Sequence, residues 1–231
     1  MPSFVEPIQV DHQEMDLYVA VPSGSGPFPA IVVAQHGGGV DTFIRAMADQ
    51  FAAAGYAAAA PDLYHRLGPH EARSIQHLKD VEMIADVQAT VHFLQHHNAI
   101  NSNAIGVTGY CMGGRVAYLM AAAVPQFKAA VPYYGGNIMV PWGDGVVAPF
   151  ERTSEISCPI LFHFGEEDAN PSLADMEKLD AELTRHGKVH TFYTYPNAGH
   201  AFMDFTGERY REAAATASWP RTLDFFAQHL R

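Results

Sequence analysis

Cysteine is scarce in this chain, because only Cys111 and Cys158 carry a thiol among 231 residues. Two cysteines cannot build the disulfide framework of a small secreted protein, so we expect a reducing, cytoplasmic setting. Basic residues are also few, with 14 Lys and Arg against 25 Asp and Glu, and the formal net charge is −11. This excess of negative charge makes nucleic acids and anionic membranes poor partners.

Long apolar stretches are missing too, since no run of the sequence approaches the roughly 20 residues that span a bilayer. The segment Met1 to Glu6 has neither the basic start nor the apolar centre of a signal peptide. Hydrophobic residues make up 48% of the chain and charged residues 17%. This composition and length suit a domain with a large core, so we predict a single domain over residues 1–231.

Strand-like and helix-like segments alternate along the chain, which predicts an α/β fold with a mainly parallel central sheet and helices on both faces. An early antiparallel strand is expected at 15–21. Asn170 is the expected N-cap of a helix that starts at Pro171. The irregular loop 135–157 is either a candidate substrate lid or a surface excursion. The further expected strands are 30–35, 56–60, 105–108, 129–134, 160–164 and 189–195, and the expected helices are 42–54, 80–96, 170–186 and 208–230.

The sequence Gly109-Tyr-Cys-Met-Gly-Gly has the G-x-nucleophile-x-G pattern of a nucleophile elbow, with cysteine as the nucleophile. It joins an apolar strand to an alanine-rich helix. Flanking glycines are needed because side chains there would collide in so sharp a turn. The turn places the Cys111 thiol at a helix N-terminus, where peptide dipoles favour a thiolate. Cys158, by contrast, precedes Pro159 and is expected to be structural.

Two later segments supply the partners that a cysteine nucleophile requires. Asp168 follows the expected strand 160–164, and His200 follows the expected strand 189–195. Nucleophile, acid and histidine thus occur in the order of the α/β-hydrolase fold, each after its own strand. Glu166 and Glu167 compete with Asp168 for the acidic role, and we prefer Asp168 because it lies nearest the following helix cap.

The expected chemistry is covalent acyl transfer. Cys111 attacks a carbonyl carbon, His200 moves the proton, and Asp168 orients and stabilises the imidazolium. The backbone N–H groups of Met112 and Gly37 are the expected oxyanion hole, because one follows the nucleophile and the other lies in a glycine-rich loop after an early strand.

The whole chain resembles the dienelactone hydrolase family of cysteine-type α/β-hydrolases, which includes the carboxymethylenebutenolidases. The resemblance implies an α/β-hydrolase fold, opening of lactone or ester bonds, and no cofactor or metal. It also implies the triad Cys111, Asp168 and His200 and the oxyanion donors Gly37 and Met112. The matching stretches are Ala34-Gln35, Gly55-Tyr56-Ala57, Pro61-Asp62-Leu63-Tyr64, Gly109 to Gly114, Tyr133-Tyr134-Gly135, Ala198-Gly199-His200 and Arg221 to Phe225.

Two positions depart from the family pattern. His36 stands where the family has a glutamate that helps to activate the thiol, and Asp204 stands where the type enzyme has an arginine for a substrate carboxylate. We therefore expect a small neutral ester or lactone as substrate and partner. His36 either polarises the thiol, lines the pocket or holds the oxyanion loop, and the last role is slightly preferred. Candidate pocket-wall residues are Tyr64, Tyr134, Trp142 and Phe202.

Other functions are less favoured by the sequence. His92 and His96 have metal-ligand spacing, but no His-Glu-x-x-His pattern surrounds them, so a solvated helix face is expected. The Gly37–Gly39 segment lacks the Lys-Ser/Thr of a phosphate loop. Two alternatives to a cysteine hydrolase remain: a ligand-binding relative without turnover, and a thiol redox sensor. The oligomeric state is not predicted.

Overall fold

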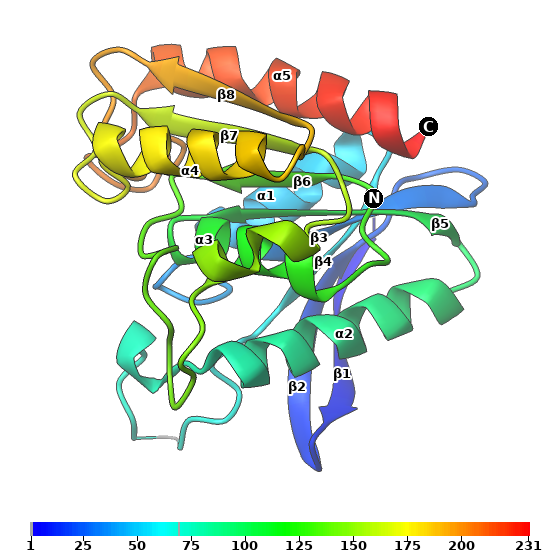
Figure 1. Cartoon of the computed structure of the whole chain (residues 1–231). Coiled ribbons are helices and arrows are strands. Elements are labelled where there is room, and N and C mark those ends of the chain that lie inside the picture. Colours follow the sequence, from blue (N-terminus) through cyan, green and yellow to red (C-terminus); the bar gives the residue numbers. More distant parts are fainter. Residues whose placement is uncertain (1, 69) are drawn as a thin grey trace.

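The computed structural model describes residues 2–68 and 70–231, in which eight strands form one sheet in the order β1-β2-β4-β3-β5-β6-β7-β8 (Figure 1). The five pairings from β4 through β3 to β8 are parallel, whereas β2 pairs antiparallel with both β1 and β4. The strands are β1 (Ser3–Val10), β2 (Gln13–Ala20), β3 (Phe28–Ala34), β4 (Ala57–Pro61), β5 (Ile100–Tyr110), β6 (Ala130–Tyr133), β7 (Ile160–Gly165) and β8 (His190–Tyr195).

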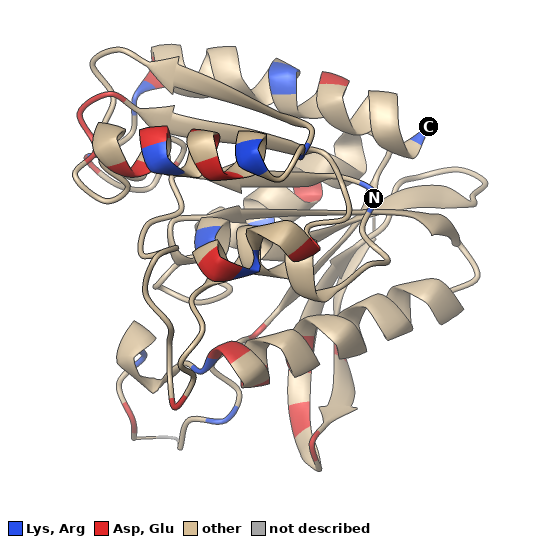
Figure 2. Ribbon diagram, in the orientation of Figure 1, with Lys and Arg blue, Asp and Glu red and all other residues tan. Residues whose placement is uncertain are grey.

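The central strands lack charged residues because helices cover both of their faces. Figure 2 shows β3, β4 and β5 free of Lys, Arg, Asp and Glu, and β4 reads Ala-Ala-Ala-Ala-Pro with every residue buried. The helices are α1 (Thr42–Ala53), α2 (Asp80–His96), α3 (Met112–Ala123), α4 (Leu173–Arg185) and α5 (Glu212–Leu230), with short 3₁₀ helices η1 (Ile75–His77) and η2 (Pro149–Glu155). The mainly parallel sheet and its two helical layers confirm the predicted α/β architecture.

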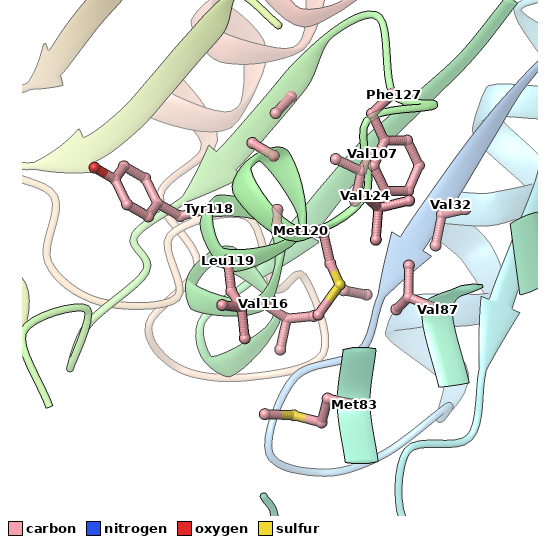
Figure 3. Packing of buried hydrophobic residues seen from close by; sticks show 14 of the residues in the cluster. Val32, Met83, Val87, Val107, Val116, Tyr118, Leu119, Met120, Val124 and Phe127 are labelled. Atoms are coloured by element: carbon pink, nitrogen blue, oxygen red, sulfur yellow. The ribbon is translucent and has the colours of Figure 1, made fainter. Parts of the chain in front are cut away.

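Each face of the sheet has its own hydrophobic core. On one face α2, α3 and α4 pack against the strands, and on the other face α1 and α5 do so. Figure 3 shows part of the first core, where Val116 and Met120 of α3 lie near Met83 and Val87 of α2. Apolar packing therefore holds α3, the helix that follows the elbow, and fixes the position of its first turn.

The first strand, β1, was not predicted from the sequence. β1 forms a hairpin with β2 through Asp11 and His12, both at positive φ. Its residues are mostly exposed because it lies at the end of the strand order, so they show no buried apolar run. Pro7, which lacks an N–H group, is compatible with such an edge position.

Two predicted helix starts were wrong. Helix α4 is capped by Ser172, whose hydroxyl accepts the N–H of Asp175 in a capping box, and not by Asn170. The N–H of Asn170 instead donates to Asp168. Helix α5 begins at Glu212 rather than near residue 208 and continues through Pro220.

The loop 135–157, predicted to be irregular, contains η2. Among the described residues no helix combines the length and apolarity needed to cross a membrane.

Candidate active site

Cys111 lies at a sharp turn between β5 and α3. Its φ is 59° and its ψ is −117°, and its N–H donates to the carbonyl of Tyr133 at 3.1 Å. A positive φ at a residue with a Cβ atom costs backbone energy, and such strain is held only where the surrounding structure dictates it. The parallel β5–β6 pairing on one side and the buried helix α3 on the other impose the turn. The predicted elbow conformation is therefore present.

The glycines of the motif are required by backbone contacts. A Cβ atom on Gly109 would overlap the carbonyl of Gly113, and one on Gly113 would overlap the carbonyl of Ala34. A Cβ atom on Gly114 would likewise overlap the carbonyl of Tyr133. These contacts let α3 begin directly against β3 and β6, which brings the thiol to the carboxyl ends of the strands.

His200 and Asp168 lie beside the thiol. The Nδ1 atom of His200 is 2.9 Å from Oδ2 of Asp168, and the side chains are 23% and 2% exposed, respectively. His200 and Cys111 line the same cavity, and their proximity raises the pKa of the imidazole. Glu166 and Glu167, the competing acids, are exposed. The structure thus brings the three predicted side chains together: Cys111 and His200 line one cavity, and His200 is bonded to Asp168.

The electrostatics of this chain favour an ion pair. Burial opposes charge on Cys111, but hydrogen bonds from His200 and from the backbone N–H groups of Met112 and Gly37 outweigh it and lower the thiol pKa. Burial likewise opposes protonation of His200, but its bonds to Asp168 and Cys111 raise the imidazole pKa to about 10. Opposite pKa shifts of two neighbouring groups favour the thiolate–imidazolium form over the neutral pair.

The backbone N–H groups of the two predicted oxyanion donors, Met112 and Gly37, both act on the sulfur and lower the pKa of Cys111. The loop that carries Gly37 is held by a hydrogen bond, because the Tyr64 hydroxyl donates to the Gly37 carbonyl at 3.1 Å. The Gln35 side chain accepts the N–H of Leu63 at 3.2 Å, which ties the end of β3 to the segment after β4. Two backbone donors near one nucleophile suit a developing oxyanion.

His36 contacts its own loop. Its Nε2 atom lies 2.7 Å from Oδ2 of Asp41, and its ring packs edge-on against Phe43 with 5.7 Å between centroids. The other carboxylate oxygen of Asp41 caps α1 by accepting the N–H groups of Phe43 and Ile44. His36 therefore links the glycine loop to the start of α1, which is the arrangement that a loop-holding role requires.

A cavity of about 130 Å³ opens beside the thiol. Trp142, a predicted wall residue, lines it, whereas Tyr64, Tyr134 and Phe202 are at most 4% exposed and lie in the packing behind it. Tyr134 packs edge-on against the His200 ring at 5.2 Å. The cavity is lined by Ile75, Cys111, Met112, Gly136, Asn137, Trp142, Asn170 and His200.

Sequence reasoning missed two polar wall residues, Asn137 and Asn170. They are joined by a hydrogen bond from the Asn137 N–H to Oδ1 of Asn170 at 3.0 Å. Asn170 also donates its N–H to Asp168 at 2.9 Å, so it connects the cavity wall to the triad acid. The signal available was the position of Asn170 two residues after Asp168, which we interpreted as a helix cap.

In residues 2–68 and 70–231, no group of three or more His, Cys, Asp or Glu side chains is arranged to hold a metal ion. His92 and His96 stack with 4.1 Å between ring centroids, and Nδ1 of His96 bonds the carbonyl of His92.

Comparison with known proteins agrees with this architecture. A Methylorubrum extorquens protein assigned by name to the carboxymethylenebutenolidases is 31% identical over 225 residues, covering 92% of this chain and 76% of its own length. A Bradyrhizobium protein named as a 2-oxo-3-(5-oxofuran-2-ylidene)propanoate lactonase is 29% identical over 221 residues, covering 92% of this chain and 89% of its own.

The structural likeness extends over nearly the entire molecule. A Klebsiella pneumoniae protein assigned by name to the dienelactone hydrolases superposes with a TM-score of 0.91 at 29% identity, covering 99% of both chains. The sheet order and the elbow are those of the α/β-hydrolase fold. The sequence model of the dienelactone hydrolase family matches residues 15–230. The chain therefore belongs to the dienelactone hydrolase family of ester and lactone hydrolases.

Proposed function

We propose that the protein hydrolyses a neutral carboxylic ester or lactone through a covalent intermediate on Cys111. The observation that carries the proposal is the placement of Cys111 at the elbow, in the lining of the same cavity as His200, which is bonded to Asp168. His200 and the backbone N–H groups of Met112 and Gly37 also lower the pKa of Cys111. A buried thiolate with a bonded imidazolium and two backbone donors is suited to acyl transfer.

In the proposed reaction the Cys111 sulfur attacks the carbonyl carbon, and the carbonyl oxygen accepts hydrogen bonds from Met112 and Gly37. The C–O bond of the ester breaks, and His200 donates its Nε2 proton to the leaving alkoxide. His200 then takes a proton from water, which attacks the thioester and releases the acid. Asp168 keeps Nδ1 protonated and stabilises the imidazolium. For a lactone, alcohol and acid leave as one molecule.

The charge of the cavity supports a neutral substrate. Its lining contains neither Lys nor Arg. Asp204, which stands where the family type enzyme has an arginine, accepts hydrogen bonds from Thr206 through Oδ1. Arg66 is engaged by Asp86 and Asp11. The names of the two relatives described above support lactone or ester chemistry in general.

Thiol chemistry tests the nucleophile. Iodoacetamide at pH 7 should abolish aryl ester hydrolysis with one equivalent incorporated, and Cys111→Ala should be inactive and unlabelled. Cys158 provides the internal control, because burial raises its pKa to about 12 and keeps it protonated. Hydrolysis that survives alkylation of Cys111 would refute the proposal. A wild-type protein without any esterase rate would favour a ligand-binding relative or a redox sensor.

Substrate charge is tested separately. A neutral aryl acetate should be turned over with a higher kcat/KM than an anionic dienelactone. A strong preference for the dienelactone would show that another cation replaces the missing arginine.

A further inference from the structure

Arg115 is a fully buried arginine directly behind the nucleophile elbow. It lies in the first turn of α3, four positions after Cys111, and its side chain is 0% exposed. A guanidinium carries its charge at any physiological pH, so its burial requires a dense set of partners. The family reaction described above gives this charge no role.

Asp80, the first residue of α2, is the ionic partner of Arg115. The two form a bidentate pair, with Nη1 on Oδ1 and Nη2 on Oδ2. The same carboxylate accepts the N–H of Trp142 at 3.0 Å, and the N–H of Asp80 donates to the Trp142 carbonyl at 3.2 Å. The start of α2 is thus bound simultaneously to α3 and to the segment 137–142.

The remaining donors of Arg115 hold that segment directly. Its Nε donates to the Asn137 carbonyl at 3.1 Å and its Nη2 to the Val140 carbonyl at 2.7 Å. The guanidinium also lies over the Trp142 ring, 4.0 Å from the centroid. Asn137 and Trp142 both line the cavity at Cys111. The Arg115 side chain therefore contacts both Asn137 and Trp142 on the side away from the cavity.

We propose that Trp142 is a specificity-determining residue that contacts the substrate, and that Arg115 and Asp80 are its positioning pair. The pair shapes the cavity wall without touching the reacting atoms. Its removal should weaken the binding of substrates large enough to reach Trp142 and leave the sulfur chemistry intact. The kinetic part of this inference rests on the proposed ester hydrolysis, whereas the position of Trp142 does not.

The principal variant is the double substitution Arg115→Met/Asp80→Asn, which removes both charges and leaves neither buried alone. Arg115→Lys is the conservative variant, because lysine keeps the charge but loses the planar fork and the stacking surface. Tyr118→Phe is the matched control. It removes a buried hydrogen bond of the same helix, from Tyr118 to Thr153 at 2.6 Å, which does not involve the cavity.

Tryptophan fluorescence measures the accessibility of Trp142 in the cavity wall and does not require catalytic turnover. The chain has two tryptophans, Trp142 and Trp219, so a Trp219→Phe background isolates Trp142. In that background the double variant should show stronger acrylamide quenching than its parent, by about twofold. Arg115→Lys should fall between the two, and Tyr118→Phe should match the parent.

Steady-state kinetics measure how the change in the cavity wall affects substrate binding. The double variant should raise KM for p-nitrophenyl hexanoate by about tenfold, with kcat nearly unchanged and a much smaller effect on the acetate. The pH profile of iodoacetamide inactivation should be unchanged, because the bonds around the sulfur do not include Arg115. Trp142→Leu should reproduce the KM change in a chain whose ion pair is intact.

Several results would overturn the proposal. Unchanged quenching and unchanged KM in a folded double variant would do so, as would an equal response of Tyr118→Phe. A shifted alkylation profile would mean that the pair acts on the elbow instead of the wall. If the double variant does not fold, the proposal is tested by the quenching of Arg115→Lys and by the KM of Trp142→Leu. Parent-like values in both variants would overturn it. Survival of hydrolysis after Cys111 alkylation would refute the cysteine mechanism, while the quenching experiment would still decide the role of the pair.

Discussion

At the residue scale, the two cysteines differ because their surroundings differ. Cys111 and Cys158 are both largely buried, and burial alone raises a thiol pKa. Three hydrogen-bond donors reverse that effect at Cys111, whereas at Cys158 only the charge of Lys128 opposes it. The pKa of each thiol therefore depends on the groups around the sulfur and not only on its depth in the molecule.

Asp168→Asn should lower kcat by about 10²- to 10⁴-fold, the range that loss of a triad acid produces in related constellations. The amide cannot stabilise the imidazolium, so the pKa of His200 should fall and the thiol pKa should rise. Stopped-flow hydrolysis and the pH profile of alkylation measure both effects. Glu167→Gln, at an exposed neighbour, is the control and should keep the parent rate. A loss below about threefold in Asp168→Asn would contradict the assigned role.

His36→Ala should lower kcat by about tenfold and leave the alkylation pKa of Cys111 in place, because His36 bonds Asp41 and is not among the hydrogen-bond donors to the sulfur. His36→Gln, which can still reach Asp41, should retain most of the rate. A shifted thiol pKa in His36→Ala would favour direct activation. An unchanged rate would remove any functional role for this residue.

The sequence was sufficient to predict the catalytic candidates but not the cavity. Cys111, Asp168 and His200 follow three strands in a recognisable order, so local patterns were enough to choose them. Arg115 and Asp80 are separated by 35 positions and meet only when α2 packs against α3. No local signal connects them. The wall residues Asn137 and Asn170 depend on tertiary contacts in the same way.

At the element scale, the elbow depends on how closely α3 approaches β3. Gly113→Ala should destabilise the protein by several kcal/mol, about 3 or more, because the added methyl group would meet the backbone carbonyls of Ala34 and Gln35, which cannot move away. Gly37→Ala is the control, since no heavy atom lies within 4 Å of its added Cβ. Urea unfolding measures both. Equal stability of the two variants would contradict the close packing of the elbow.

Strand β7 contains a titratable residue that should control acid stability. His163 is fully buried between the Tyr195 hydroxyl at 2.8 Å and the Thr222 hydroxyl at 3.0 Å, and burial, with Arg221 nearby, lowers its pKa to about 3. The unfolded chain binds this proton near pH 6.5 and the native chain does not. Stability from His163 is therefore complete above pH 6.5 and is lost as the pH falls towards 3.

The expected slope of that loss is about 1.4 kcal/mol per pH unit from this residue. Urea unfolding between pH 7 and pH 4 measures it. His163→Gln should flatten the dependence by this amount, whatever its stability at pH 7. His229→Gln, at a half-buried residue near the end of α5, is the control and should keep most of the parent slope. An unchanged slope in His163→Gln would show that the native state admits the proton.

Element boundaries were the weakest predictions from sequence. Buried parallel strands are short apolar runs and were located correctly. β1 was missed because an edge strand needs no such run. The predicted cap at Asn170 was wrong because Ser172 and Asp175 form a reciprocal capping box, while Asn170 is drawn to Asp168. The side-chain oxygen of Asn170, which a cap would use, instead accepts the N–H of Asn137, a tertiary contact that the local sequence does not reveal.

At the scale of the whole molecule, the net charge of −11 should influence substrate choice. Figure 2 shows acidic residues on several outer elements, including α4 and the β1–β2 hairpin. An anionic ester should be repelled at low ionic strength. Its kcat/KM should rise by about two- to fivefold between 10 and 200 mM NaCl, whereas that of a neutral ester should stay constant. Equal salt responses of both esters would contradict this.

The fold class was predictable because it depends on alternation, which the sequence displays along its length. Strand order was not, since nothing local indicates that β4 precedes β3 in the sheet. The strand order is given by the structure alone. The substrate choice that we propose depends on a few side chains at the cavity and on overall charge, and the alternation of strands and helices gives no information about either.

The edge strand β1 has a consequence for self-association. An outer strand offers unpaired backbone groups to any extended chain that approaches it, which is a route to aggregation. Pro7 lacks one of the donors that such a chain would need, and Glu6 adds a charge next to it. Replacing Pro7 by valine would complete that row of donors, so a substitution far from the thiol could shorten the shelf life of the protein without altering its chemistry.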